Sequence, residues 1–141
     1  MWTIEQRVGR LIEIQLVSPI LLPELEGFGQ RIAEIVGRLS RQGQRVISCT
    51  DLRAANILPP DVAEWFIKLM HRDNPVLERG AFLTGASAVF ALQIERMFKQ
   101  SSSLSRRTFR EAGPLLDWLG EVATSAERER LHRFLAENGR L

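Results

Sequence analysis

The sequence predicts an α/β domain with helices packed on a mixed sheet of about five strands, and three observations carry this prediction. Residues 2–8 and 11–17 alternate apolar and polar side chains around Gly9-Arg10, a pattern typical of an antiparallel hairpin. Short apolar runs then alternate with amphipathic segments, which indicates right-handed crossovers and largely parallel strands. The length of 141 residues is near the commonest size for one domain, so we expect residues 1–141 to form a single domain.

The elements of the first half follow from local patterns. Ser18-Pro19 ends the second strand, because proline cannot continue a hydrogen-bonded ladder. Residues 22–41 are predicted to form a helix that closes at Gln42-Gly43-Gln44, since one set of apolar side chains recurs at helical spacing: Phe28, Ile32, Ile35, Val36 and Leu39. Residues 45–50 form a short apolar run, as expected of a strand covered on both faces, and residues 51–60 are predicted to be a loop.

The second half continues the alternation. A helix is predicted to open at Pro60-Asp61 and to end within residues 71–75, because proline and an acidic residue suit the first helical turn. Residues 79–84 are predicted to form a buried strand, and the helix after Ser87 has this apolar stripe: Val89, Phe90, Ile94, Met97 and Phe98. Residues 106–109 are expected to form a short edge strand and residues 111–122 a fourth helix. Ser125 is predicted to cap a final helix at about residues 125–138.

Charge and hydropathy narrow the expected partners and the expected cellular location of the protein. The net charge is only +2, and the arginines are mixed with acidic residues along the chain, so we expect no nucleic-acid partner. No apolar run approaches the roughly 20 residues that span a bilayer, so no membrane span is expected. Glu5, Arg7 and Arg10 interrupt any secretory signal, and the lone Cys49 agrees with a reducing compartment. We therefore expect a cytoplasmic protein.

Few residues carry a catalytic or metal-binding pattern. Cys49 lies in an apolar run without a base nearby in sequence, which favours a buried, inert thiol. His71 and His132 are far apart, and no spacing of histidine, cysteine and carboxylate is typical of a metal site. The Gly85-Ala86-Ser87 segment lacks the pattern and the lysine of a phosphate-binding loop, so Ser87 is expected to be a helix N-cap.

The sequence also shows no recognisable site for acid–base or nucleophilic catalysis. No serine, histidine and aspartate stand in a nucleophile-elbow arrangement, and Asp73, Glu78 and Glu95 form no recognisable acid–base pair in the sequence. We therefore expect a protein that is not an enzyme and that uses no cofactor or metal.

The order of elements, a hairpin and a helix followed by repeated strand–helix units, resembles the STAS-like fold. This fold is shared by anti-sigma-factor antagonists and by related small bacterial STAS/CRAL-TRIO-like proteins. The resemblance covers about half of the chain and rests on these stretches: Asp51-Leu52-Arg53, Glu78-Arg79-Gly80-Ala81-Phe82-Leu83, Ala91-Leu92-Gln93, Arg106-Arg107-Thr108-Phe109 and Trp118-Leu119. It implies a non-enzymatic regulatory or scaffold module that binds a protein partner in bacterial signalling.

The predicted binding surface is the rim after the central strand together with the second helix. In the antagonists, a phosphorylatable serine lies at the start of the helix that follows this strand. Residues 56–61 contain no serine or threonine, and Asp61 already places a negative charge there. We hypothesise that Asp61 imitates the charge of the modified state. The partner-binding residues are predicted to be Asp51, Arg53, Asn56, Asp61 and Glu64. For Asp51, an alternative is that its carboxylate accepts backbone N–H bonds in its own loop.

Two further hypotheses concern apolar side chains. The alternative function is a small-molecule or lipid-binding domain with an apolar cavity between helices and sheet, lined by aromatic residues that otherwise form the core: Trp65, Phe66, Phe90, Phe98 and Trp118. In the final helix, Leu131, Phe134 and Leu135 must be buried against this domain or against another copy. A homodimer through the C-terminal helix is therefore a hypothesis.

Overall fold

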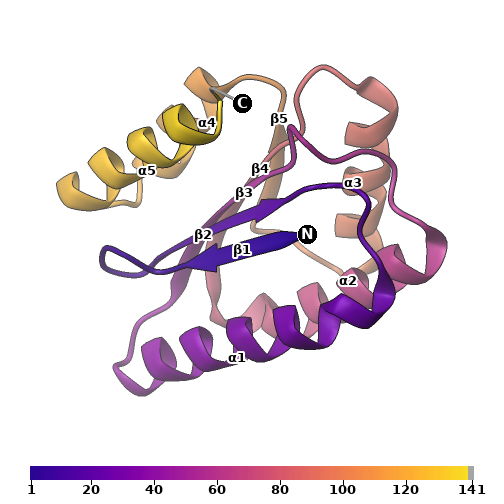
Figure 1. Ribbon diagram of the computed structural model, residues 1–141. Helices are drawn as coiled ribbons and strands as arrows, with labels where there is room; N and C mark the ends of the chain where they lie inside the picture. Colours follow the sequence, from indigo (N-terminus) through magenta and orange to yellow (C-terminus); the bar gives the residue numbers. More distant parts are fainter. Residues whose placement is uncertain (140–141) are drawn as a thin grey trace.

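The computed structural model describes residues 1–139, and they form the predicted α/β fold (Figure 1). The first half contains β1 (Trp2–Glu5), β2 (Leu11–Leu16), the 3-10 turn η1 (Leu22–Glu24), α1 (Leu25–Arg41), β3 (Val46–Asp51) and α2 (Pro60–Asp73). The second half contains the 3-10 turn η2 (Asn74–Val76), β4 (Leu77–Leu83), α3 (Ala88–Gln100), β5 (Arg106–Phe109), α4 (Ala112–Gly120) and α5 (Ser125–Asn138).

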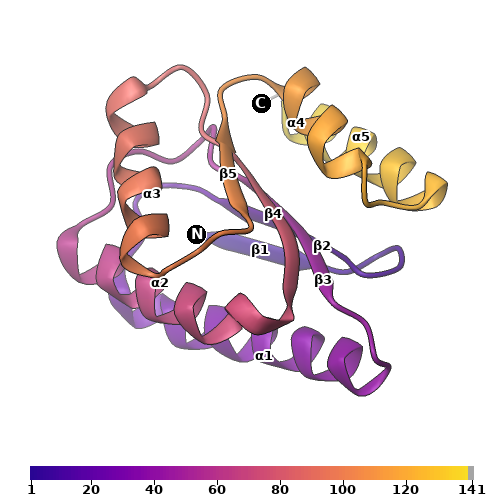
Figure 2. The same ribbon diagram turned by 180° about the vertical axis from the view of Figure 1, so that it is seen from behind.

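The strands form one mixed sheet whose spatial order is the chain order, β1-β2-β3-β4-β5. β1 pairs with β2 in antiparallel fashion, and the remaining pairs are parallel, which confirms the predicted hairpin followed by strand–helix units. Each crossover helix therefore returns on the same side of the sheet, because the strand order never reverses. As a result, α1, α2 and α3 cover one face, while α4 and α5 cover the other (Figures 1 and 2).

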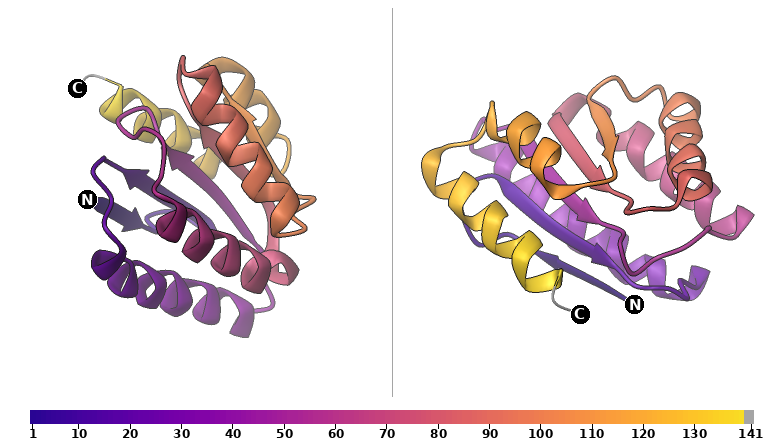
Figure 3. Two further views of the ribbon diagram at one scale, coloured as in Figure 1. Left: turned by 90° about the vertical axis from the view of Figure 1, so that its right-hand side faces the viewer. Right: turned by 90° about the horizontal axis from the view of Figure 1, so that it is seen from above.

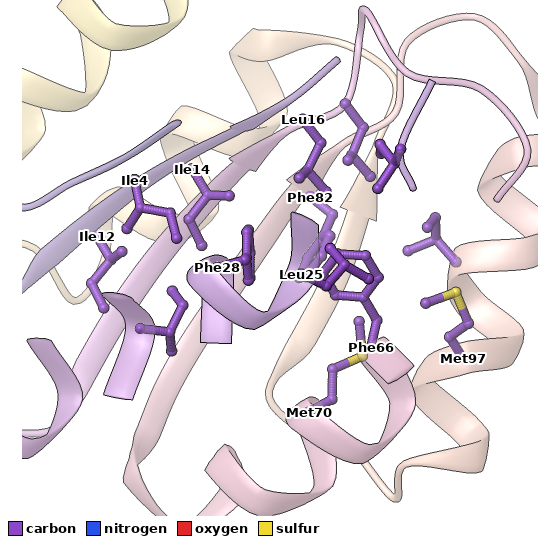
Figure 4. Packing of buried hydrophobic residues seen from close by; sticks show 14 of the residues in the cluster. Ile4, Ile12, Ile14, Leu16, Leu25, Phe28, Phe66, Met70, Phe82 and Met97 are labelled. Carbon is purple, nitrogen blue, oxygen red and sulfur yellow. The ribbon is translucent and has the colours of Figure 1, made fainter. Parts of the chain in front are cut away.

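A separate apolar core fills each side of the sheet. The larger core lies under α1, α2 and α3 and is shown in part in Figure 4. On β2, Ile12, Ile14 and Leu16 belong to this core, whereas Leu11 belongs to the smaller core under α4 and α5. This alternation follows from the two-residue period of a strand. The sheet is therefore covered on both faces, including the N-terminal hairpin strand β2.

The final helix is held to the sheet by polar groups as well. Figure 3 shows α5 lying along β2. The Glu13 side chain on β2 is only 1% exposed, and its carboxylate accepts two hydrogen bonds from Arg130 of α5, at 2.9 and 3.0 Å, and one from Arg7 at 2.7 Å. An ion pair of this kind requires both partners, since either charge alone would be buried without compensation.

The start of α5 corrects one prediction. Thr124, rather than Ser125, is the N-cap residue, because its hydroxyl accepts the N–H of Glu127 at 3.1 Å. The Glu127 carboxylate in turn accepts the N–H groups of Thr124 and Arg10, both at 2.8 Å. The same carboxylate packs against Gly9, whose φ of +56° suits glycine. The hairpin turn and the capping box of α5 are thus one hydrogen-bonded unit.

Candidate functional site

The predicted partner-binding residues Asp51 and Arg53 form an internal brace. Asp51, predicted to begin the loop, is instead the last residue of β3 and is 1% exposed. Arg53 donates to its two carboxylate oxygens from the backbone N–H, Nε and Nη2, at 3.0, 3.0 and 2.8 Å. These hydrogen bonds to Asp51 raise the pKa of Arg53 above its ordinary value. Arg53 Nη2 also donates to the Leu135 carbonyl of α5 at 2.8 Å, so the pair ties the end of α5 to the central strand.

The other three predicted residues lie on the opposite side of the sheet, at the start of α2. Asn56, Asp61 and Glu64 are all exposed. The backbone N–H of Asn56 donates to the Ser18 hydroxyl, and Asp61 accepts the N–H of Val62 at 2.8 Å. Glu64 pairs with Lys68 at 3.6 Å. The structure therefore places Asn56, Asp61 and Glu64 at the surface near α2, leaves Arg53 exposed on the α5 side of the sheet, and buries Asp51.

An exposed apolar surface, not anticipated from the sequence, lies beside these three residues. We call it the apolar rim, and its members are Leu21 (60% exposed), Leu22 (41%), Ile57 (49%), Val89 (66%) and Leu92 (58%). Val89, predicted to lie on the buried stripe of its helix, is thus on the exposed side of α3. A usable signal was present in the sequence, because apolar residues run directly into prolines at 21–23 and 57–60.

Hydrogen bonds link the three segments of the apolar rim. The Ser18 N–H donates to the Ala54 carbonyl at 3.1 Å, which links the loop after β2 to the loop after β3. The Gln93 side chain of α3 accepts the N–H of Leu58 and donates to its carbonyl, both at 2.9 Å. The loop that carries Ile57 is therefore held against α3, and the loop after β2 is joined to it.

A second candidate site is a cavity of about 90 Å³ between the sheet and the layer formed by α1, α2 and α3. Its walls are mostly apolar and include Ile12, Phe28, Phe66 and Met70, which Figure 4 labels. Of the five aromatic residues predicted to line such a cavity, Phe66 does so. Trp118 lies on the other side of the sheet, where the guanidinium groups of Arg79 and Arg107 stack on its ring.

The strand that crosses the floor of the cavity contributes two polar side chains. Ser48 and Thr50 of β3 are 9% and 3% exposed, and both line the cavity. Neither hydroxyl has a hydrogen-bond partner within residues 1–139, and neither is among the fully buried polar atoms that lack one, so both oxygens reach the open space of the cavity. These groups are therefore able to bond to a molecule inside the cavity.

A half-buried cation lies at the edge of the same cavity. Arg106 of β5 donates through Nη1 to the Met70 carbonyl, the Asn74 amide oxygen and the Ser103 hydroxyl, at 3.3, 2.5 and 2.6 Å. Its Nε and Nη2 have no partner within residues 1–139, and because they are not among the fully buried polar atoms they remain open to a ligand or to water. Burial lowers the pKa of the Arg106 guanidinium to about 10, so it stays positively charged at neutral pH.

Comparison of the chain with family models, curated proteins and solved structures finds no match. The resemblance to STAS-like proteins therefore stays a prediction, and the two sites above have to be interpreted from their own chemistry.

The structure also shows where the other residues considered in the sequence lie. Ser87 is the N-cap of α3, as predicted, because its hydroxyl accepts the N–H of Phe90 at 3.2 Å. His71 Nδ1 lies 3.2 Å from the Ser101 carbonyl, and His132 is exposed on α5. Among residues 1–139, no group of histidine, cysteine or acidic side chains is arranged to hold a metal. Over the same residues, no helix is long and apolar enough to cross a membrane.

The apolar side chains of α5 are buried within this chain. Leu131, Phe134 and Leu135 are 1%, 5% and 3% exposed and belong to the core between α4, α5 and the sheet. The dimer hypothesis arose because these side chains must be buried, and packing within this chain already buries them. The homodimer itself stays a prediction.

We expect Cys49 to be unreactive in the folded protein. Its side chain is 0% exposed in the core under α4 and α5, and burial raises the pKa of the thiol well above its ordinary value, with a smaller contribution from Asp51. A thiolate is the reactive form, so iodoacetamide should label the protein in denaturant but not in buffer at neutral pH. Mass spectrometry of both samples measures the difference, and rapid labelling of the native protein would contradict the prediction.

Proposed function

We propose that this protein is a non-enzymatic regulatory or scaffold module that binds a protein partner through the apolar rim and the adjacent start of α2. The observation that carries the proposal is the exposure of five large apolar side chains on joined segments, each between 41% and 66% exposed. Clustered apolar side chains on the surface of a domain are typical of protein-binding sites. The resemblance to anti-sigma-factor antagonists supports the same class of function in bacterial signalling, with a cytoplasmic setting.

The acidic residues beside the apolar rim suggest the charge of the partner. Asp61 is exposed in the first turn of α2, and Glu64 follows one turn later. Charges at the edge of an interface increase the rate of association with a surface of opposite sign more than they increase affinity. The partner therefore presents an apolar patch bordered by basic groups, and Asp61 takes the place of the phosphoserine in the resemblance.

A partner-capture experiment tests this proposal. The tagged protein is purified from its native host, and a stoichiometric co-purifying protein is identified by mass spectrometry. We expect Leu92→Arg to weaken its binding by about tenfold or more, because an arginine would be desolvated in the centre of the interface. Asp61→Ala should give a smaller loss that disappears at high salt.

Leu104→Arg is the matched control. Leu104 is 99% exposed in the loop between α3 and β5, at the far end of α3 from Val89, so the same substitution is made outside the apolar rim. We expect its affinity for the partner to equal that of the wild type. A partner that binds the Leu92→Arg variant as tightly as the Leu104→Arg variant would rule out the apolar rim as its site.

The cavity favours a second candidate function, a small-molecule or lipid-binding domain. An interior with ordinary packing leaves few voids larger than a water molecule. Here a space of about 90 Å³ lies beside two hydroxyls and a guanidinium that have free hydrogen-bonding groups. Binding of a small apolar compound with a stoichiometry of one, measured by isothermal titration calorimetry, tests this function independently of the partner.

A further inference from the structure

We propose that the cavity binds a small amphipathic carboxylate, with its apolar body in the cavity and its head group between Arg106 and Ser48. This inference rests on the second candidate function and names the chemical class of its ligand. Three observations on the lining residues carry it: the size of the space, the position of the mouth, and the close approach of Ser48 and Arg106 over Gly80.

The size of the cavity limits the apolar part of the ligand. An apolar cavity of about 150 Å³ holds benzene, with six carbon atoms, so in proportion a space of about 90 Å³ accommodates a body of about four carbon atoms or fewer. The walls that surround it come from the sheet and from α1, α2 and α3, and most of them are buried aliphatic or aromatic side chains. A compact hydrocarbon body matches these walls, because transferring it from water to an apolar space is favourable.

The mouth of the cavity lies at its charged end. Most lining residues are buried, but five are only half-buried, and these come from the ends of α1 and α2, from η2 and from β5: Val36, Leu69, Asp73, Val76 and Arg106. A ligand that enters here with its apolar end first leaves its polar end beside Arg106. The polar end is therefore the part that determines charge specificity.

The sheet surface provides a place for this polar end. Ser48, Gly80 and Arg106 are neighbours on three adjacent parallel strands, with Ser48 opposite Gly80 and Gly80 opposite Arg106. A Cβ atom at Gly80 would be crowded, at 3.1 Å from the Ser48 hydroxyl oxygen and 3.3 Å from both Arg106 Cγ and Leu77 Cδ2. Glycine thus allows the Ser48 hydroxyl and the Arg106 side chain to lie close to each other on this face of the sheet.

The charges at the mouth favour an anion. Asp73 also lines the cavity and its charge favours the charged form of Arg106, but its carboxylate accepts hydrogen bonds from Arg72 at 2.9 and 3.2 Å, so two guanidinium groups accompany one carboxylate at this end. Arg106 contacts only neutral acceptors within residues 1–139. A carboxylate accepts two parallel hydrogen bonds from a guanidinium, which matches the free Nε and Nη2 of this side chain.

Calorimetric titration with probes that share a four-carbon body tests the proposal. Pentanoate, butanol and butylamine all carry a butyl group and differ in the head group. We expect pentanoate to bind with a stoichiometry of one and at least about tenfold more tightly than butanol, since a charge-assisted hydrogen bond is about twice as strong as a neutral one. Butylamine should bind more weakly than butanol.

Variants then assign the head group and the body separately. Arg106→Gln should reduce the preference for pentanoate over butanol to less than about twofold. Arg106→Lys, which retains the positive charge, should preserve most of the preference if Arg106→Gln fails to fold. Ser48→Val adds apolar volume to the floor and should abolish binding of all three probes, while Thr108→Val, on β5 and outside the cavity lining, should change none of them.

The outcomes separate the two levels of the proposal. Equal affinities of the wild type for pentanoate and butanol would overturn the carboxylate class and leave the cavity as a binding site for neutral compounds. No binding of any probe, together with no stabilisation by butanol in thermal unfolding, would overturn the second candidate function itself.

Discussion

Replacing Glu13 with alanine is expected to lower the free energy of unfolding by about 3–5 kcal/mol, the range for breaking a buried ion pair on one side. Glu13 lies in the middle of β2 under α5, and its side chain is 1% exposed. Its loss leaves Arg130, which is 12% exposed, without its carboxylate partner on the sheet. Urea unfolding followed by circular dichroism measures the change.

Glu137→Ala is the control for this prediction. Glu137 pairs with the same arginine at 3.1 Å but is 58% exposed, so its removal should cost less than about 1 kcal/mol. The double variant Glu13→Leu with Arg130→Met should recover most of the stability lost by Glu13→Ala, because it removes both buried charges. A Glu13→Ala variant as stable as Glu137→Ala would mean that the ion pair does not hold α5 to the sheet.

Replacing Asp51 with alanine is expected to lower the free energy of unfolding by about 2–3 kcal/mol, the upper range for hydrogen bonds to a charged group. The substitution removes all three hydrogen bonds from Arg53 to the carboxylate. Arg53 also donates to the Leu135 carbonyl, so the end of α5 should loosen. Urea unfolding measures the stability, and hydrogen exchange of the last amides of α5 measures the loosening.

The same variant distinguishes the brace from a partner-binding role. Asp51→Asn should lose less stability than Asp51→Ala, because an amide oxygen still accepts one of the hydrogen bonds. Partner affinity should change little in Asp51→Asn, because the side chain at this position is buried. If Asp51→Ala instead kept the free energy of unfolding of the wild type but no longer bound the partner, Asp51 would belong to the binding surface as the sequence predicts.

The fold could be predicted because its signals are local. The apolar run before Asp51 and the helical spacing of Phe28, Ile32 and Ile35 each depend on a few neighbouring residues. The alternation of β2, by contrast, is typical of a strand with one face in water, yet Glu13 is buried. The alternation cannot show that the polar face is covered by α5, a helix more than a hundred residues later in the chain. Nor can it show that Arg130 of that helix lies opposite Glu13.

The candidate sites were less predictable because they depend on which segments meet in space. The exposure of Asp61 and Glu64 followed from their place on an amphipathic helix. The exposure of Val89 did not, because Val89 and Phe90 are adjacent apolar residues and only the packing of α3 decides which faces the sheet. Likewise, the sequence shows Ser48 within an apolar strand but not that Gly80 and Arg106 lie beside it.

The two faces of the sheet differ in when they are covered as the chain is made. The helices on one face alternate with the strands, so that face is closed as the sheet grows. The other face waits for α4 and α5, which come after every strand, and until then no helix covers Leu11, Ile47 and Leu83. A ribosome-bound chain with a finished sheet therefore exposes these apolar side chains, together with the carboxylates of Glu13 and Asp51. The nascent protein should thus be a substrate for chaperones that hold exposed apolar chains, and it should cease to be one as soon as α5 is released.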